Sequence, residues 1–380
     1  MKKLNQSGIA HWIVPVLVVL IIAAVGTRIL TTSHADPINP SAALSYAGKA
    51  KQDLTLSQTL NIPGSQISDL ALNPELNVAY TTNDFKISVW STSSGTIPKL
   101  VTTVPSSASK IVVSNDGNYL YSINGNVLAI YQTSTSSTSP LTYLSSSLIN
   151  GSQPDYLKVS GNYAYVVDWA SVTSKPKVEI YDISNKQAPN EVAALGVNSD
   201  LLKSPTAIAV RGEYAYVTSD ANTTLNVFNI SKKTNPVYIS SVKLTPGLYN
   251  NAAGLIAFKD TYAYVTGINS NVINIVNIAN PSAPTLSSTI TPPSQNTAYG
   301  DDPYNLLVTN DKLVFYTING GNYLALSYNL TSPATPTYDQ TVSLNGNNPA
   351  AIASASGYLY VATNISNGPS AGTVYIYKIN

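Results

Sequence analysis

The amino-acid sequence predicts an all-β repeat protein that closes into a ring, and three observations support this prediction. A strand–turn–strand unit, GEYAYVTSDANTTLNVFNI at residues 212 to 230, recurs in variant form along the chain. From residue 54 onward, turn residues separate short apolar runs, and no long stretch has the periodicity of a helix. The last copy of the unit is one strand short, while an extra strand-like segment precedes the first copy.

Residues 1 to 35 are predicted to be an N-terminal membrane anchor or signal segment. Two lysines precede an apolar run over residues 9 to 25, and Arg28 follows it, which predicts a cytoplasmic N-terminus and export of the rest. Two outcomes stay open. The run forms a retained transmembrane helix, or a signal helix is cleaved after Ala35 and the protein is secreted. The spacing between the end of the apolar run at Val25 and a cleavage site after Ala35 is long for a signal peptide, which favours the anchor. An anchor places the protein at the cell membrane on its extracytoplasmic face.

Residues 36 to 53 contain prolines and small residues without a clear period, so we interpret them as a linker. Residues 54 to 380 then form the predicted repeat domain.

Composition excludes several function classes. Charged residues make up 10% of the chain, and residues 37 to 380 hold 17 basic and 18 acidic residues, so a basic surface that tracks phosphates is not expected and nucleic acid is excluded as a partner. There is no cysteine, and His11 and His34 both precede the repeat domain. A Ser-His-Asp triad, a Cys-His nucleophile and a conventional zinc site are therefore not expected there.

The repeats are marked by the second residue of each aromatic pair, and these markers are 41 to 52 residues apart: Tyr80, Tyr121, Tyr165, Tyr216, Tyr264, Tyr316 and Tyr360. This interval is the length of a four-stranded propeller blade. In the fourth copy we expect strands at 206–210, 214–219, 225–230 and 236–242. They are apolar on both faces, as expected of sheets packed between two neighbours.

The two ends of the domain predict how the ring closes. The seventh copy supplies strands at 351–354, 358–363 and 374–379 and then stops, while LTLSQTL at 54–60 has the pattern of the missing fourth strand. Pairing these segments removes two exposed sheet edges. The sequence therefore predicts a seven-bladed β-propeller with four-stranded blades, in which the N-terminal strand closes the last blade.

Three copies resemble a known repeat family. KVEIYDISNKQAP at 177–189, LNVFNISKKTNP at 225–236 and INIVNIANPSAP at 273–284 are similar to LVIVD repeats and, more loosely, to YVTN-type propeller repeats. The resemblance implies the β-propeller of a bacterial surface or exported protein. It implies no particular reaction, because neither family has a single activity.

Most of the paired tyrosines are interpreted as core. Twelve of the 26 tyrosines occupy these pairs, and residues two apart on a strand point to the same face. We expect them to fill the wedge between adjacent blades.

The predicted ligand-binding residues lie on loops that meet at one end of a propeller, namely those after the second strand and those leading into the first strand. They are Asp168, Trp169, Asp220, Tyr249, Asn250, Tyr299, Asp301, Asp302 and Tyr304. Aromatic faces with amides and carboxylates are typical of glycan and peptide surfaces, although solvated loops can have the same composition. Asp301 and Asp302 lack the alternating acidic pattern of a calcium loop, so we predict no metal and no cofactor.

The preferred function is a membrane-anchored extracytoplasmic module that binds or adheres to a surface protein or a glycan. The alternative is an exported hydrolase or lyase that uses channel carboxylates, for which the candidates are Asp155, Asp168, Asp220 and Asp301. A structural envelope component is a third class. The shortage of titratable groups favours binding over catalysis.

Overall fold

The computed structural model describes residues 54–380 except for 64–65, 84, 93–96, 137–138, 152, 170–175, 198–199, 247–253, 267–271, 293–303, 320–321, 345–347 and 366–370. The predicted N-terminal helix and the linker lie outside the described residues. Across the part of the chain that is described, no helix is long and apolar enough to cross a membrane.

The described chain forms seven antiparallel sheets of four strands each, which confirms the predicted seven-bladed all-β fold. Blade 1 contains β2 (Asp69–Asn73), β3 (Val78–Thr82), β4 (Ile87–Ser91) and β5 (Lys99–Val104). Blade 2 contains β6 (Lys110–Val113), β7 (Tyr119–Asn124), β8 (Val127–Thr133) and β9 (Leu141–Leu148). Blade 3 contains β10 (Pro154–Ser160), β11 (Tyr163–Asp168), β12 (Lys177–Asp182) and β13 (Asn190–Leu195). Blade 4 contains β14 (Pro205–Arg211), β15 (Tyr214–Ser219), β16 (Thr224–Asn229) and β17 (Val237–Lys243).

The remaining blades repeat this order. Blade 5 contains β18 (Ile256–Lys259), β19 (Tyr262–Thr266), β20 (Ile273–Asn277) and β21 (Thr285–Ile290). Blade 6 contains β22 (Tyr304–Thr309), β23 (Lys312–Asn319), β24 (Asn322–Asn329) and β25 (Thr337–Ser343). Blade 7 contains β26 (Asn348–Ala355), β27 (Tyr358–Asn364), β28 (Ala371–Ile379) and β1 (Leu54–Pro63).

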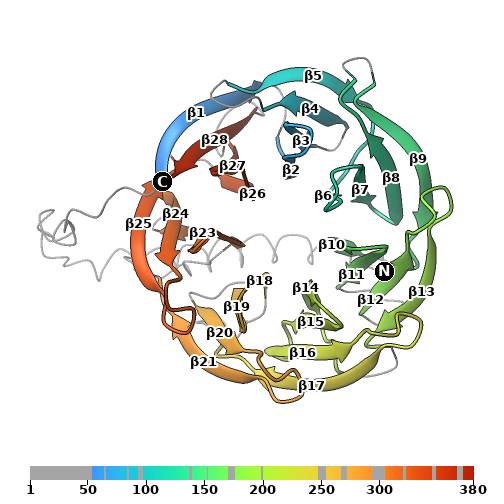
Figure 1. Cartoon of the computed structure of the whole chain (residues 1–380), viewed down its shortest axis with the longest axis vertical. Helices are drawn as coiled ribbons and strands as arrows, with labels where there is room; N and C mark the ends of the chain where they lie inside the picture. The colour runs from blue at the N-terminus through green and yellow to red at the C-terminus, as the bar shows by residue number, and fades with distance from the viewer. Residues whose placement is uncertain are drawn as a thin grey trace, which may run out of the picture. The chain divides into compact units, whose positions relative to one another are not determined.

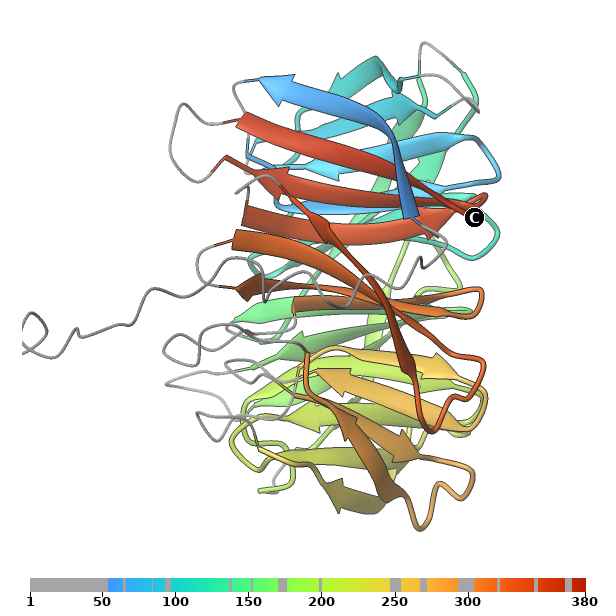
Figure 2. The same cartoon turned by 90° about the vertical axis from the view of Figure 1, so that its left-hand side faces the viewer.

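The blades surround a central axis. The first strand of each blade lies innermost and the fourth lies on the circumference (Figure 1). Seen from the side, each blade is twisted, so that its outermost strand crosses the inner strands at an angle (Figure 2). Because consecutive strands are antiparallel, the ends at which the seven inner strands begin all meet at one end of the ring.

Closure of the ring joins the two ends of the domain. β1 pairs antiparallel with β28, from Leu54 opposite Ile379 to Pro63 opposite Ala371. This pairing confirms the prediction that the N-terminal strand completes the last blade. The register shifts once, between Leu56 and Gln58. The fourth strand of every other blade has a shift at the equivalent place, for example opposite Val227 and Phe228 in blade 4. β1 therefore has the same geometry as a fourth strand that follows its own blade in sequence.

The core consists of seven apolar clusters, and each cluster lies between two adjacent blades. Each contains one of the seven marker tyrosines. Tyr216, for example, is 2% exposed and packs with Leu225 of its own blade and Val265 of blade 5. The first tyrosine of the same pair, Tyr214, is half-buried against this cluster. The tyrosine pairs are thus packing residues, as predicted.

Hydrogen bonds also cross between blades at one repeated position of the outermost strand. Each donor lies opposite the third-strand residue that precedes the register shift, and its acceptor is a carbonyl oxygen of the next blade. The pairs are Ser145 to Lys186 (2.6 Å), Ser240 to Pro281 (2.7 Å), Ser288 to Ala334 (2.8 Å) and Gln340 to Leu54 (3.0 Å). Gln340 also accepts a hydrogen bond from the Leu54 backbone N–H at 3.2 Å. The closing strand is therefore held to both of its neighbours.

Deletion of residues 54–60 is expected to abolish cooperative unfolding, because it removes most of β1 and exposes the edge of β28. Urea unfolding followed by tyrosine and tryptophan fluorescence measures this effect. As a graded comparison, Gln340→Ala removes the two hydrogen bonds to Leu54 but leaves β1 in place, and should lower the free energy of unfolding by about 1–2 kcal/mol. A deletion variant that unfolds with the cooperativity and midpoint of the wild type would contradict closure by β1.

Candidate functional site

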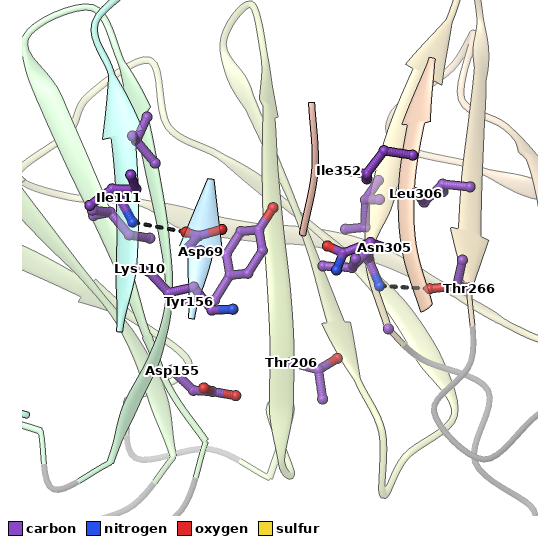
Figure 3. A pocket seen from close by; sticks show the side chains of 15 residues that line it. Asp69, Lys110, Ile111, Asp155, Tyr156, Thr206, Thr266, Asn305, Leu306 and Ile352 are labelled. Atoms are coloured by element: carbon purple, nitrogen blue, oxygen red, sulfur yellow. Dashed lines mark hydrogen bonds between the residues drawn. The ribbon is translucent and has the colours of Figure 1, made fainter. Parts of the chain in front are cut away.

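A polar cavity of about 350 Å³ lies on the axis, at the end of the ring where the inner strands begin. Every blade contributes to its wall, mostly with the first residues of its inner strand. The side chains drawn in Figure 3 include Asp69, Lys110, Asp155, Tyr156, Thr206, Asn305 and Ile352. We call this space the channel cavity.

The wall of the channel cavity is asymmetric. The charged side chains, Asp69, Lys110 and Asp155, come from blades 1, 2 and 3, and Figure 3 shows them on one side. The opposite side comes from later blades and presents neutral side chains such as Asn305 and Ile352. A ligand here therefore meets charged groups on one side and uncharged polar and apolar groups on the other.

Asp69 connects the inner strands of blades 1 and 2. One carboxylate oxygen accepts a hydrogen bond from the backbone N–H of Ile111 at 2.9 Å, and the other accepts one from Leu70 at 2.9 Å. Burial nevertheless raises the pKa of Asp69 above its usual value, while the Lys110 ammonium acts in the opposite direction. The carboxylate is thus a tethered group whose charge is disfavoured by its surroundings.

Tyr156 lies beside Asp69 on the same wall (Figure 3). Burial, together with the negative charge of Asp69, raises the pKa of the Tyr156 phenol to about 12. Because the phenol stays protonated near neutral pH, Tyr156 offers this wall a hydrogen-bond donor.

The neutral side is held by hydrogen bonds between blades and strands. The Asn305 amide donates to the Ala350 carbonyl oxygen at 3.1 Å and to the Tyr316 hydroxyl. The Thr266 hydroxyl accepts the backbone N–H of Leu255 at 2.9 Å. Residues on this wall are therefore positioned before any ligand arrives.

Asp168, a predicted ligand residue, is fully buried at the end of β11. One carboxylate oxygen accepts the backbone N–H of Gln153 at 2.9 Å, so the side chain holds the segment that enters β10. A Cβ at Gly151 would come within 2.6 Å of the other carboxylate oxygen, so any larger residue at position 151 would displace this side chain. In this structure Asp168 contacts protein rather than open space.

Trp169 follows Asp168 and is 43% exposed. Its backbone N–H donates to the carbonyl oxygen of Gln153 at 3.4 Å, only two residues before Asp155 of the channel cavity. The indole is therefore an exposed aromatic group close in the fold to the charged side of the cavity.

Asp220 and Tyr304 also lie at this end of the ring. Asp220 is half-buried and begins the turn between β15 and β16, where its carbonyl oxygen accepts the Thr223 backbone N–H at 2.9 Å. Tyr304 is the first residue of β22. The other five predicted residues, Tyr249, Asn250, Tyr299, Asp301 and Asp302, lie outside the described residues, and the ligand role of all nine stays a prediction.

Of the carboxylates predicted for catalysis, Asp155 is the one among the described residues that lines the channel cavity. Sequence reasoning missed Asp69, Lys110 and Tyr156, because it concentrated on the loops. A usable signal existed, since Asp69 and Lys110 are each the first residue of their blade's inner strand. In the ranges that the structure describes, no group of three acidic or histidine side chains could hold a metal ion.

Seven four-stranded blades around an axial cavity define this protein as a β-propeller. A family model described as "Beta propeller domain" matches residues 110–378, and the chain belongs to that family. No curated protein sequence matches the chain significantly.

Solved structures share the fold at low sequence identity. The propeller of Cps50 (Swd1) from Myceliophteria thermophila has a TM-score of 0.62 and 10% identity, and the match covers 86% of this chain and 100% of that one. A candidate 6-phosphogluconolactonase from Bacteroides fragilis has a TM-score of 0.62 and 14% identity, with coverages of 86% and 91%. The WD40 propeller of Doa1 has a TM-score of 0.61 and 14% identity, with coverages of 87% and 98%. At these identities the similarity establishes the fold alone.

The raised pKa of Asp69 predicts a pH dependence of stability. A carboxyl whose pKa is higher in the folded state contributes most below its ordinary pKa of about 3.9, and that contribution is lost as pH rises through the higher value. Asp69→Asn should therefore lose stability relative to the wild type as pH falls from 7 to 4, as measured by urea unfolding.

Asp116→Asn provides a control of opposite sign. Asp116 is exposed, and the Ser114 hydroxyl, hydrogen-bonded to its carboxylate, lowers its pKa. The wild type should lose any advantage over Asp116→Asn as pH falls. A wild-type advantage over Asp69→Asn that shrinks in the same direction would contradict the assignment for Asp69.

Proposed function

We propose that this protein is a binding or adhesion module whose partner, a surface protein or a glycan, docks at the channel cavity end of the ring. The observation that carries this proposal is the cavity itself, since inner-strand residues of all seven blades converge on it. Concave sites with a few convergent polar groups are the usual form of ligand sites.

The rigidity of the wall supports binding. Asp69, Asn305 and Thr266 are each held by hydrogen bonds to neighbouring backbone or side chains, so a ligand need not order them. The exposed Trp169 adds an aromatic face near the charged side, and its large contact area suits either a sugar ring or an apolar side chain.

Catalysis by a hydrolase or lyase is the second candidate. Asp69 and Asp155 line the same cavity, and a raised carboxyl pKa is a property of general acids. Against this, both oxygens of Asp69 already accept backbone hydrogen bonds, which restricts their access to a substrate. The neighbours do not decide between the two, because a WD40 propeller and a candidate lactonase have similar folds.

The cellular location is part of the proposal. The lysines and apolar run of residues 1 to 35 support export and anchoring at the cell membrane, with the propeller on the extracytoplasmic face. The LVIVD-like and YVTN-like copies support placement among bacterial surface propellers.

The binding proposal is tested on an array of glycans and bacterial surface proteins. We expect Asp155→Ala combined with Trp169→Ala to reduce the bound signal at least tenfold without changing the thermal midpoint, because both side chains are exposed. Asp116→Ala, an exposed change in the β6–β7 turn at the opposite end of the ring, is the matched control. Equal binding by the double variant and the wild type would refute the site. Cleavage of an array glycan that Asp155→Asn abolishes would favour the enzyme.

The anchor proposal predicts that the mature protein keeps its apolar segment and stays in the membrane fraction of a bacterial host. Intact-mass spectrometry of that fraction provides the measurement. A mature chain that begins at Asp36 and accumulates in the medium would instead establish a cleaved signal.

A further inference from the structure

A second cavity of about 350 Å³ lies between blades 1 and 2, away from the axis. Serines 106 and 107, from the segment between β5 and β6, form one side, and residues of β7, β8 and β9 form the other. Within the described part of the chain, this cavity and the channel cavity share no lining residue. We call it the blade 2 cavity.

None of the described residues that line it is charged. Serine, asparagine and tyrosine side chains supply hydroxyl and amide groups, and Val127 and Ala129 complete the wall. The channel cavity, by comparison, includes two aspartates and a lysine. The two cavities therefore suit ligands of different chemistry.

Ala129, which lines the blade 2 cavity, is the smallest side chain at its position among the seven blades. Ala129 lies opposite Ser146, and the register shift that every blade has follows one residue later, between Ile130 and Tyr131. Each other blade has a larger side chain at the equivalent position: Ser88, Glu179, Asn226, Asn274, Leu326 and Tyr375. Blade 2 thus lacks the side-chain volume that the other blades place there.

An exposed aromatic ring borders this space. Tyr143 is 55% exposed, its ring meets that of Tyr131 edge-on with centroids 5.7 Å apart, and its hydroxyl donates to Ser146 at 3.0 Å. The Tyr131 hydroxyl lies 2.5 Å from that of Ser106. The Tyr143 ring is held at its edge and its hydroxyl, so little rotational freedom remains to be lost on binding.

We propose that the blade 2 cavity binds a neutral carbohydrate. The C–H face of a pyranose ring covers an aromatic ring such as Tyr143, while its hydroxyls match the serine and asparagine groups. A phosphate, carboxylate or amine would be desolvated without a counter-charge, and a purely apolar ligand would cover hydroxyls without pairing them. The volume lies in the lower part of the range for ligand sites, roughly 300–1,000 Å³. This site goes beyond the docking function proposed for the channel cavity.

Blade 4 contains a matched control for the aromatic ring. Tyr238 of β17 meets Phe228 edge-on at 5.7 Å, its hydroxyl donates to Ser241 at 3.2 Å, and it is 37% exposed. The residue equivalent to Ala129 is Asn226, a larger side chain that is buried. Tyr238 therefore repeats the ring geometry beside a larger side chain at the position of Ala129.

The test uses the full-length protein in mild detergent and four neutral tetrasaccharides: cellotetraose, maltotetraose, mannotetraose and chitotetraose. Saturation-transfer NMR and calorimetric titration measure binding. At least one sugar should bind the wild type, and Tyr143→Ala should weaken binding at least tenfold, whereas Tyr238→Ala should leave it unchanged. Ala129→Leu should also abolish binding, because it fills the cavity with the residue that blade 6 has at this position.

Three outcomes would overturn the proposal: no binding of any of the four sugars, equal weakening by Tyr143→Ala and Tyr238→Ala, or binding lost in the Asp155→Ala, Trp169→Ala variant and retained in Tyr143→Ala. The last result would place the sugar at the channel cavity and so support the docking function instead. Thermal midpoints monitor folding, and the exposed Tyr143→Ala change keeps the test valid should Ala129→Leu unfold.

Discussion

Residues 54–63 and 371–379 come from opposite ends of the domain and pair as neighbouring strands of one sheet. Each of the seven apolar clusters lies between two blades, so no blade buries its faces alone. In an open arc, blades 1 and 7 would each leave one apolar face in water. Pairing of β1 with β28 prevents this, because it fixes blade 7 against blade 1. The channel cavity depends on the same pairing, since its wall needs inner strands from all seven blades.

Neutral groups do most of the joining between blades. A serine or glutamine of the outermost strand donates to the next blade at four interfaces, and blade 3 has Ala193 at the corresponding position. At that interface the Lys233 ammonium lies 5.5 Å from the centre of the Tyr163 ring. Such contacts need no counter-charge, which explains how a chain with 10% charged residues holds a ring together.

Much of the fold was predictable because the recurring sequence unit marks equivalent strands in successive blades. A marker tyrosine, preceded by a second tyrosine in five of the seven copies, identifies each second strand. The strands expected in blade 4 agree with β14 to β17 within one residue at every end. The site was less predictable. A propeller predicts which end collects the loops, but the inward direction of Asp69 or Tyr156 depends on strand register at the start of β2 and β10, where no motif repeats. Asp168 was predicted to face a ligand, but an aspartate at a strand end can equally accept a hydrogen bond from a neighbouring backbone N–H, as Asp168 does here.

The position of Ala129 and its equivalents shows how different blades of this ring can serve stability or ligand binding. In blade 5, Asn274 accepts the Thr245 backbone N–H at 2.8 Å and so holds the segment that leaves blade 4. In blade 3, Glu179 is fully buried at the same position, with the Lys177 ammonium at 2.5 Å and the Tyr181 hydroxyl at 2.6 Å. In blade 2, Ala129 makes neither contact and leaves a cavity. The other six blades have larger side chains at this position, so blade 2 can lose packing volume there without loss of the fold. In a repeat protein, the copy that departs from its equivalents toward a smaller, neutral side chain is therefore where a ligand site can arise at the lowest cost in stability.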